Sequence, residues 1–167
     1  MKSKTLCLLR HAHSVKGDAI TPDHERELST GGIEECNSIA KWMKKINFSV
    51  DAVICSDAMR TRQTYGAVNA AHPLPTADYQ AGLYLAASGG ILKAIKNTNS
   101  KHDSLLVIGH NPGLHDIALK LLCDEDRRDS MLVTGLVTAG LVVLEAPAAS
   151  WDALAYGQCR FKHYIQP

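Results

Sequence analysis

The chain has 167 residues, of which 46% are hydrophobic and 21% are charged, a balance typical of a globular protein. Its formal net charge of +1 and the lack of a Lys/Arg cluster argue against a nucleic-acid-binding or membrane-surface protein. A small anionic ligand remains possible, because a single pocket can be basic in a nearly neutral protein. Five widely spaced cysteines without a CxxC pair predict neither a disulfide framework nor a zinc ribbon.

Apolar segments are too short for a membrane span or a secretory signal. The run at residues 6–9 is shorter than a signal-peptide core, and the longest run, 131–144, falls below the ~20 residues that cross a bilayer. Length and composition therefore predict a single domain over residues 1–167, located in the cytoplasm, with Cys7 and Cys55 as buried, reduced thiols.

Predicted strands and helices alternate along the chain. Short apolar runs predict strands at residues 5–9, 52–55, 104–108, 140–145 and 151–156. The first three are continuous apolar runs, typical of central strands covered on both faces. The last two are predicted to form a hairpin. This alternation predicts an α/β layer fold.

Apolar positions three and four apart predict helices between these strands. The first helix follows the capping residue Ser29, the second opens at Asp57, and a shorter one contains residues 91–95. A further helix begins at Pro112, with Asn111 as its N-cap. The apolar stripe of the first helix comprises Ile33, Cys36, Ala40 and Met43.

Polar side chains stand where the first three strands end. Arg10 and His11 follow the first strand, Ser56 follows the second and precedes Arg60, and His110 follows the third. Parallel strands present their carboxyl ends at one edge of a sheet, where α/β proteins bind ligands beside helix N-termini. If these strands are parallel neighbours, two histidines and at least one arginine meet in one crevice. The helix N-termini there favour an anion, above all a phosphate.

Phosphoryl transfer uses all of these groups. A neutral imidazole is a nucleophile toward phosphorus, and guanidinium groups pair with phosphate oxygens. A second, protonated histidine would stabilise the charge of the transferring group. Each residue taken alone has a structural alternative, either a hydrogen-bonded histidine or a surface arginine. A metal site is disfavoured because arginines repel cations and no carboxylate shares these strand ends, so we expect no metal.

Four segments carry a resemblance to a known family: "LLRHAHS", "DHERELSTGG", "SDAMRTRQT" and "VIGHNPGL". The sequence resembles the histidine phosphatase superfamily, whose signature is an apolar strand followed by Arg-His-Gly, and within it the SixA-like phosphohistidine phosphatase branch. Ala12 stands at the glycine position. The resemblance covers residues 4–123 and implies a phosphoglycerate mutase-like fold, a three-layer αβα sandwich with a mostly parallel central sheet.

The resemblance also implies roles for individual residues. His11 is the residue phosphorylated during turnover, Arg10 and Arg60 hold the phosphoryl oxygens, and His110 is the second histidine of the pocket. His13 is interpreted as a residue of the rim. Three further residues fall on motif positions and are expected to bind substrate or to order the pocket: Ser14, Asn111 and Arg26.

The general acid is missing from this set. Many members of the superfamily protonate the leaving group with a mid-chain carboxylate, but residues 79–90 contain no Asp or Glu. Asp18, in the loop at residues 16–27 that is also the candidate for a partial cover, is the candidate substitute. Tyr84 suits the role less, because its unperturbed pKa is about 10. A departing alkoxide needs this proton more than the imidazole of phosphohistidine does, so the gap favours phosphohistidine or activated aryl phosphates over sugar phosphates.

These features predict a cofactor-independent phosphatase that works through phosphorylated His11 and removes phosphate from phosphohistidine on a protein partner. Two alternatives remain open. One is a small-metabolite phosphomonoesterase or mutase with the same chemistry, and the other is a non-catalytic phosphate-binding adaptor. The expected partner is a phosphorylated protein or a small phosphate ester, with no nucleic acid and no membrane.

Overall fold

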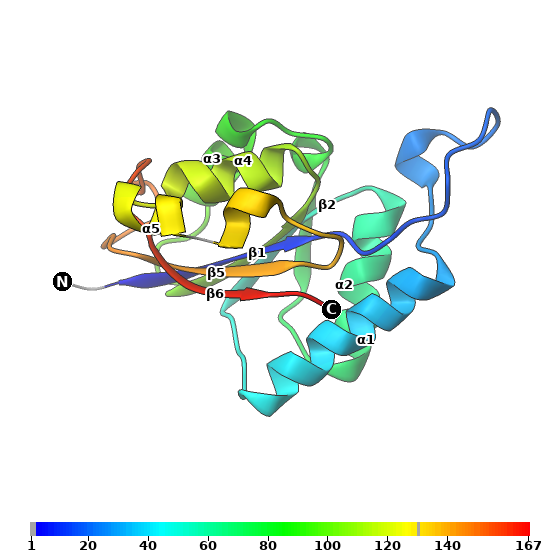
Figure 1. Cartoon of the computed structure of the whole chain (residues 1–167), viewed down its shortest axis with the longest axis horizontal. Coiled ribbons are helices and arrows are strands. Elements are labelled where there is room, and N and C mark those ends of the chain that lie inside the picture. Colours follow the sequence, from blue (N-terminus) through cyan, green and yellow to red (C-terminus); the bar gives the residue numbers. More distant parts are fainter. Residues whose placement is uncertain (1–2, 130) are drawn as a thin grey trace.

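Six strands form one sheet, in the order β3-β2-β4-β1-β5-β6, in a computed structural model that describes residues 3–129 and 131–167 (Figure 1). Strands β1 to β4 run parallel, whereas β5 lies antiparallel to β1 and β6 antiparallel to β5. The strands are β1 (Lys4–Arg10), β2 (Ala52–Ser56), β3 (Ala77–Gln80), β4 (Ser104–Gly109), β5 (Leu141–Ala146) and β6 (Arg160–Ile165).

Helices cover both faces of this sheet, so the chain has three layers (Figure 1). Helices α1 and α2 lie on one face, and α3 and α4 lie on the other. This arrangement confirms the predicted α/β sandwich. Within the described ranges, every helix is too short or too polar to cross a membrane. The helices are α1 (Thr30–Lys45), α2 (Met59–Ala71), α3 (Ser88–Lys96), α4 (Gly113–Leu121) and α5 (Asp124–Asp129), with short 3₁₀ turns η1 (Asp23–Glu25), η2 (Ala81–Leu83) and η3 (Met131–Thr134).

Strand β1 is apolar on both faces because each face packs into a different core. Leu6 and Leu8 belong to the core beneath α3 and α4, whereas Cys7 and Leu9 belong to the core beneath α1 and α2. All four side chains have no exposed surface. Side chains alternate between the faces of a strand, so a sheet covered on both sides needs such an uninterrupted apolar run. The strand is therefore a rigid support for the residues that follow it.

The C-terminal strand lies later in the chain than predicted. The prediction of a strand at residues 151–156 is wrong, because these residues form turns and loop and the strand is β6. Trp151 and Leu154 are fully buried in the core beneath α3 and α4. The indole Nε1 of Trp151 donates to the carbonyl oxygen of His102 at 2.9 Å. The apolar side chains of this segment therefore fill the core instead of alternating across a sheet.

The sequence does not predict strand β3. Its residues Asp78 and Gln80 interrupt any apolar pattern, and the strand pairs with β2 at the edge of the sheet. An edge strand has only one neighbour and tolerates polar side chains. The sequence does not predict helix α5 either, because all six of its residues are charged and no apolar stripe marks it.

Helix α1 begins where its capping residue predicts. The Oγ of Ser29 accepts a hydrogen bond from the backbone N–H of Gly32 at 3.1 Å. A Cβ at Gly32 would lie 2.1 Å from the carbonyl oxygen of His13, so only glycine lets this helix approach the chain that follows β1. Cys36 faces the core as predicted, but Ile33 is 41% exposed, which corrects its place in the predicted buried stripe.

The other helix starts are shifted by one or two residues. Helix α2 begins at Met59 rather than at Asp57. Pro112 is the N-cap of α4 rather than its first residue. Asn111 was expected to cap this helix, but its side-chain Nδ2 instead donates to the carbonyl oxygen of Leu136 at 2.9 Å. That contact directs Asn111 toward the edge of the sheet where β1 and β4 end.

The register of the sheet aligns the carboxyl ends of β1, β4 and β2. Arg10 pairs with Gly109 across β1 and β4, and Cys55 pairs with Ile108 across β2 and β4. The residues that follow these strands consequently share one edge of the sheet.

Candidate active site

A pocket of about 400 Å³ lies at this edge, and we call it the carboxyl-end pocket. It contains nearly all of the residues that the sequence predicts for the site, which come from four separate segments of the chain. The predicted residues that line it are Arg10, His11, His13, Ser14, Arg26, Arg60, His110 and Asn111. The lining is completed by three residues that the sequence does not single out: Asp23, Leu85 and Thr138.

His11 is held in the state that a nucleophile needs. Its backbone N–H donates to the carbonyl oxygen of Gly109 at 3.0 Å, which fixes it against the end of β4. Its ring Nδ1 lies 2.8 Å from the carbonyl oxygen of Ala12. A carbonyl only accepts, so Nδ1 carries the proton and Nε2 keeps its lone pair. Burial, aided by the nearby arginines, lowers the pKa of His11 to about 4, and the ring is therefore neutral at pH 7.

His110 lies next to His11, with the two ring centroids 5.2 Å apart. It is 2% exposed, and its Nε2 lies 2.8 Å from the Oγ of Ser56 at the end of β2. Burial, with smaller effects of His11 and Arg60, lowers the pKa of His110 to about 3. His110 is therefore neutral at pH 7 when no anion is bound, and the protonated second histidine expected beside a phosphoryl group stays a prediction. A phosphate dianion beside the ring would raise this pKa again, because an opposite charge favours the protonated form.

Three buried polar atoms in the pocket lack a hydrogen-bond partner among the described residues: Arg10 Nε, His110 Nδ1 and Asn111 Oδ1. The side chains of Arg10 and Asn111 are nevertheless fixed, because both donate to the carbonyl oxygen of Leu136 at 2.9 Å. A buried polar group without a partner costs about 1–3 kcal/mol. A polar ligand that supplied partners would remove this cost, so the pocket is arranged to bind one.

Asp23 supplies a carboxylate that the sequence interpretation missed. Its Oδ2 accepts hydrogen bonds from the hydroxyl of Tyr84 at 2.6 Å and from Nη2 of Arg60 at 3.0 Å. Its Oδ1 accepts from Nη1 of Arg26 at 2.8 Å. These hydrogen bonds, led by that of Tyr84, hold the pKa of Asp23 well below its usual range, so it is ionised at neutral pH. The signal was present in the sequence, since Asp23 opens the "DHERELSTGG" motif.

Arg60 is almost fully buried although it carries a charge. It is 3% exposed, and its Nη1 donates to the carbonyl oxygen of Asp23 at 2.6 Å. Arg62, two residues along α2, lies outside the pocket with its guanidinium 4.0 Å from the ring centre of Tyr79. With Arg10 and Arg26, Arg60 gives the pocket three guanidinium groups against one ionised carboxylate. This excess of positive charge favours an anionic ligand.

The structure does not bring Asp18 to the pocket. Its carboxylate accepts hydrogen bonds from the backbone N–H groups of Ile20 at 2.8 Å and Thr21 at 2.6 Å. These contacts lower the pKa of Asp18 and order the loop in which it lies. Its expected place among the catalytic residues is corrected accordingly, because the carboxylate beside the histidines is that of Asp23.

Ser14 and Arg26 order the wall of the pocket. Nη2 of Arg26 donates to the Oγ of Ser14 and to the carbonyl oxygen of Val15, both at 2.9 Å. On the opposite side, Glu35 of α1 accepts from the backbone N–H of His13 and from the hydroxyl of Thr138, both at 2.8 Å. Glu35 is thus a positioning residue that the sequence interpretation did not include.

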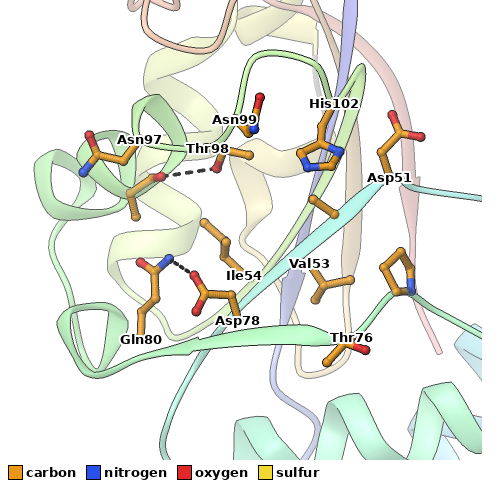
Figure 2. A pocket seen from close by; sticks show the side chains of 13 residues that line it. Asp51, Val53, Ile54, Thr76, Asp78, Gln80, Asn97, Thr98, Asn99 and His102 are labelled. Carbon is orange, nitrogen blue, oxygen red and sulfur yellow. Dashed lines mark hydrogen bonds between the residues drawn. The ribbon is translucent and has the colours of Figure 1, made fainter.

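A second hollow, of about 310 Å³, opens between the edge strand β3 and the end of α3, and we call it the edge hollow (Figure 2). Its acidic side chains already have partners. Asp51 Oδ2 accepts from the backbone N–H of Ser104 at 2.9 Å, and Asp78 accepts from Nε2 of Gln80 at 2.7 Å. The residues described as lining it include His102 but no arginine or lysine. The edge hollow therefore lacks the cationic groups that bind phosphate.

The described residues contain no group of three or more His, Cys, Asp or Glu side chains that could hold a metal ion. What the carboxyl-end pocket does offer is a neutral imidazole with a free Nε2 beside fixed guanidinium groups. The fold and this pocket together define an α/β protein with an anion-binding pocket at the carboxyl ends of its parallel strands.

Comparison with known proteins gives the family. A family model described as histidine phosphatase superfamily (branch 1) matches residues 6–83. A SixA protein from Nakamurella multipartitia, named "putative phosphohistidine phosphatase", is similar in structure with a TM-score of 0.80 and 27% identity, covering 99% of this chain and 96% of that chain. A second SixA protein with that name, from Agrobacterium tumefaciens, has a TM-score of 0.84 and 25% identity, covering 98% of both chains.

An uncharacterized protein of Mycobacterium tuberculosis is 37% identical over 113 residues, which is 68% of this chain and 69% of that protein. The chain belongs to the histidine phosphatase superfamily, with a phosphoglycerate mutase-like fold and SixA proteins among its structural neighbours. This membership supports a phosphatase, that is, a hydrolase of phosphate compounds.

Proposed function

We propose that this protein removes phosphate from phosphohistidine on a protein partner, through a phosphorylated form of His11 and without a cofactor. The observation that carries the proposal is the state of His11. Its ring is neutral, its Nδ1–H is held by the Ala12 carbonyl, and its free Nε2 belongs to a pocket lined by Arg10 and Arg60.

The reaction proceeds in two balanced steps. In the first, Nε2 of His11 attacks phosphorus, the P–N bond of the substrate breaks, and the departing imidazole leaves with its electron pair and takes up a proton from solvent water. In the second, water attacks the phosphoryl group on His11, the new P–N bond breaks with its electron pair returning to Nε2, inorganic phosphate leaves, and the proton of the attacking water passes to solvent. Arg10 and Arg60 stabilise the charge on the transferring oxygens in both steps. The free histidine is then regenerated.

The protonation state of the pocket supports phosphohistidine as the substrate. Asp23 is ionised by its hydrogen bonds to Tyr84 and Arg26, so it has no proton to give to a departing alkoxide. The imidazole of phosphohistidine departs with less help, because its P–N bond is intrinsically labile. The two SixA relatives carry the name "putative phosphohistidine phosphatase", which is in line with this proposal.

Trapping of the intermediate tests the nucleophile. The protein is incubated with a labelled phosphoryl donor, quenched in alkali and examined for acid-labile label. We expect label in the wild type and none in His11→Ala. Label retained by His11→Ala would refute His11 as the nucleophile.

A comparison of substrates tests the specificity. We expect faster turnover of a phosphohistidine peptide than of 3-phosphoglycerate. The opposite order would assign the protein to small-metabolite phosphomonoesterases or mutases. Binding of phosphate without label or turnover would make it a phosphate-binding adaptor.

A further inference from the structure

An apolar groove of about 470 Å³ adjoins the carboxyl-end pocket. One wall is the loop between η2 and α3, and the other is the start of α4. Leu85 lines both the groove and the carboxyl-end pocket, so the two are continuous at this side chain. A ligand whose phosphoryl group lies beside His11 therefore reaches the groove by passing over Leu85. Other residues that line the groove include Ala86, Ala87, Pro112, His115 and Leu119.

Leu85 is held in an unfavourable conformation at this junction. Its φ of 48° lies in the left-handed region, which is unfavourable for a residue with a Cβ. Its side chain is also 53% exposed, so it gains little from burial in the core. Neither property stabilises the fold. Strained backbone of this kind is concentrated at functional sites, where the surrounding structure maintains it.

The walls of the groove are fixed by contacts between the loop and α4. A Cβ at Gly113 would lie 1.8 Å from the carbonyl oxygen of Ala86, so the two backbones touch there. Lys120 of α4 donates to the Oγ of Ser88 at 3.0 Å and forms an ion pair with Asp116 at 2.7 Å. The groove is consequently a preformed surface rather than a gap between independent segments.

The polar residues of the groove are engaged with other parts of the protein. The ring Nε2 of His115 donates to the carbonyl oxygen of Leu132 at 2.7 Å, and the carboxylate of Asp116 is paired with Lys120. What the groove offers to a ligand is therefore its apolar side chains, in contrast to the cationic carboxyl-end pocket beside it. A volume of this size lies within the ordinary range of ligand-binding sites.

We propose that the apolar groove binds a leucine-like side chain of the substrate protein, located a few residues from the phosphohistidine, and that Leu85 is a specificity-determining residue. The inference rests on the proposed function, because it places the phosphoryl group of the same substrate beside His11. The two neighbouring surfaces then bind two parts of one protein segment. The carboxyl-end pocket binds the phosphoryl group, and the apolar groove binds an apolar side chain.

Peptides with a central phosphohistidine test this inference. Leucine is placed at each of the four positions on either side of the phosphohistidine in turn, with serine as the matched control, and kcat/KM is measured for each peptide and for phosphoramidate. Burial of one leucine side chain corresponds to a preference of about tenfold or more over serine. We expect that preference at one or more positions. Equal kcat/KM for leucine and serine peptides throughout would overturn the inference.

Variants locate the preference in the groove. Ala87→Glu places a carboxylate in the groove, and Leu85→Asn removes the apolar side chain at the junction while keeping a residue that tolerates the left-handed region. Both should abolish the preference for leucine. Ala87→Glu should change kcat/KM for phosphoramidate by less than twofold. Ala71→Glu, at an exposed position of α2, is the matched control and should leave the preference intact.

The outcomes separate this inference from the proposed function. If the wild type hydrolyses neither the peptides nor phosphoramidate, the proposed function itself fails. If the peptides are hydrolysed without a preference for leucine, only the groove assignment fails. If Ala87→Glu instead lowers kcat/KM for an aryl phosphate and leaves the peptide preference unchanged, the groove binds a leaving group and the inference is wrong. Thermal unfolding of each variant checks that it is folded.

Discussion

The carboxyl-end pocket and the edge hollow lie against the same sheet and are both lined by polar side chains, yet they differ in which of these groups have partners. In the edge hollow, the carboxylate of Asp51 accepts a hydrogen bond from the backbone N–H of Ser104. That of Asp78 accepts one from the side chain of Gln80 (Figure 2). In the carboxyl-end pocket, buried atoms of Arg10, His110 and Asn111 have no partner among the described residues. Polar groups with partners stabilise a fold, whereas buried groups without a partner lower its stability, so their concentration among the residues of one pocket indicates a role other than folding.

Charge separates the two regions further. The carboxyl-end pocket contains three arginines and one ionised carboxylate, while the lining described for the edge hollow contains acidic residues and no arginine or lysine. Only the first combination attracts a phosphoryl group. Substitutions in the carboxyl-end pocket should therefore change activity, and substitutions in the edge hollow should change stability alone.

The largest expected effect is that of His11→Ala. Loss of the nucleophile should lower kcat for phosphohistidine hydrolysis by about four to six orders of magnitude, as removal of a covalent catalyst does elsewhere. Stability should change little, because His11 lies at a strand end outside both cores. His102→Ala in the edge hollow is the matched control and should keep wild-type kcat. A comparable loss of kcat in both variants would show that the carboxyl-end pocket and the edge hollow do not differ in their contribution to catalysis.

Arg60→Lys should have the next largest effect. The substitution keeps the charge but removes the paired donors that fit phosphate oxygens, so kcat/KM should fall by about 100-fold or more. Arg62→Lys, on the same helix but outside the pocket, should change it by less than twofold. Steady-state kinetics of the two variants measure the difference. Similar kcat/KM values for the two variants would contradict a role of Arg60 in binding the phosphoryl oxygens.

The two pocket histidines, buried His110 and half-buried His11, should make stability depend on pH. Their pKa values, lowered to about 4 for His11 and about 3 for His110, lie below the value near 6.5 of an unfolded chain. The unfolded state therefore binds more protons as pH falls below 6.5, and the free energy of unfolding decreases from pH 6.5 down to about 4. Above pH 6.5 this contribution is fully present.

Two measurements check this dependence. Denaturant unfolding is measured at several pH values between 4 and 7. The free energy of unfolding should change less with pH in His110→Asn than in the wild type, because one of the two pocket histidines is gone. Titration by NMR should place both ring pKa values well below 6.5. A ring that titrates at its ordinary value would contradict the neutral state assigned to the pocket.

The smallest effect on activity is expected for Asp51→Ala in the edge hollow. Asp51 Oδ2 joins the start of β2 to the start of β4 through the backbone N–H groups of Asp103 and Ser104. Loss of these exposed hydrogen bonds should lower the free energy of unfolding by about 1 kcal/mol. Catalysis should be unaffected. Any tenfold change in kcat/KM would show that the edge hollow contributes to function.

Sequence reasoning succeeded where the information is local. The apolar run of β1 and the cap at Ser29 depend on neighbours within a few residues, and both elements form as predicted. It failed at residues 151–156, where Trp151 is apolar because it fills the core beneath α3 and α4 rather than because it belongs to a strand. Periodicity does not distinguish these two reasons for an apolar residue.

The candidate site shows the same division. Motifs around His11, Arg60 and His110 identify the residues that line the carboxyl-end pocket. Asp23 opens the "DHERELSTGG" motif, but the sequence does not show which carboxylate of this loop reaches the pocket, because Asp18 and Asp23 lie close together and both are acidic. The choice follows from contacts across the chain, in which Asp23 meets Arg60 and Tyr84 while Asp18 accepts hydrogen bonds from its own loop.

The sequence by itself determined the α/β class, the apolar strand that ends in Arg10 and His11, and the motifs that indicate the family of the chain. The tertiary structure decided their chemical state. Burial sets the pKa of His11 and His110, and long-range hydrogen bonds ionise Asp23. Apolar patterning is a property of neighbouring residues, whereas desolvation and hydrogen-bond partners depend on segments that only folding brings together.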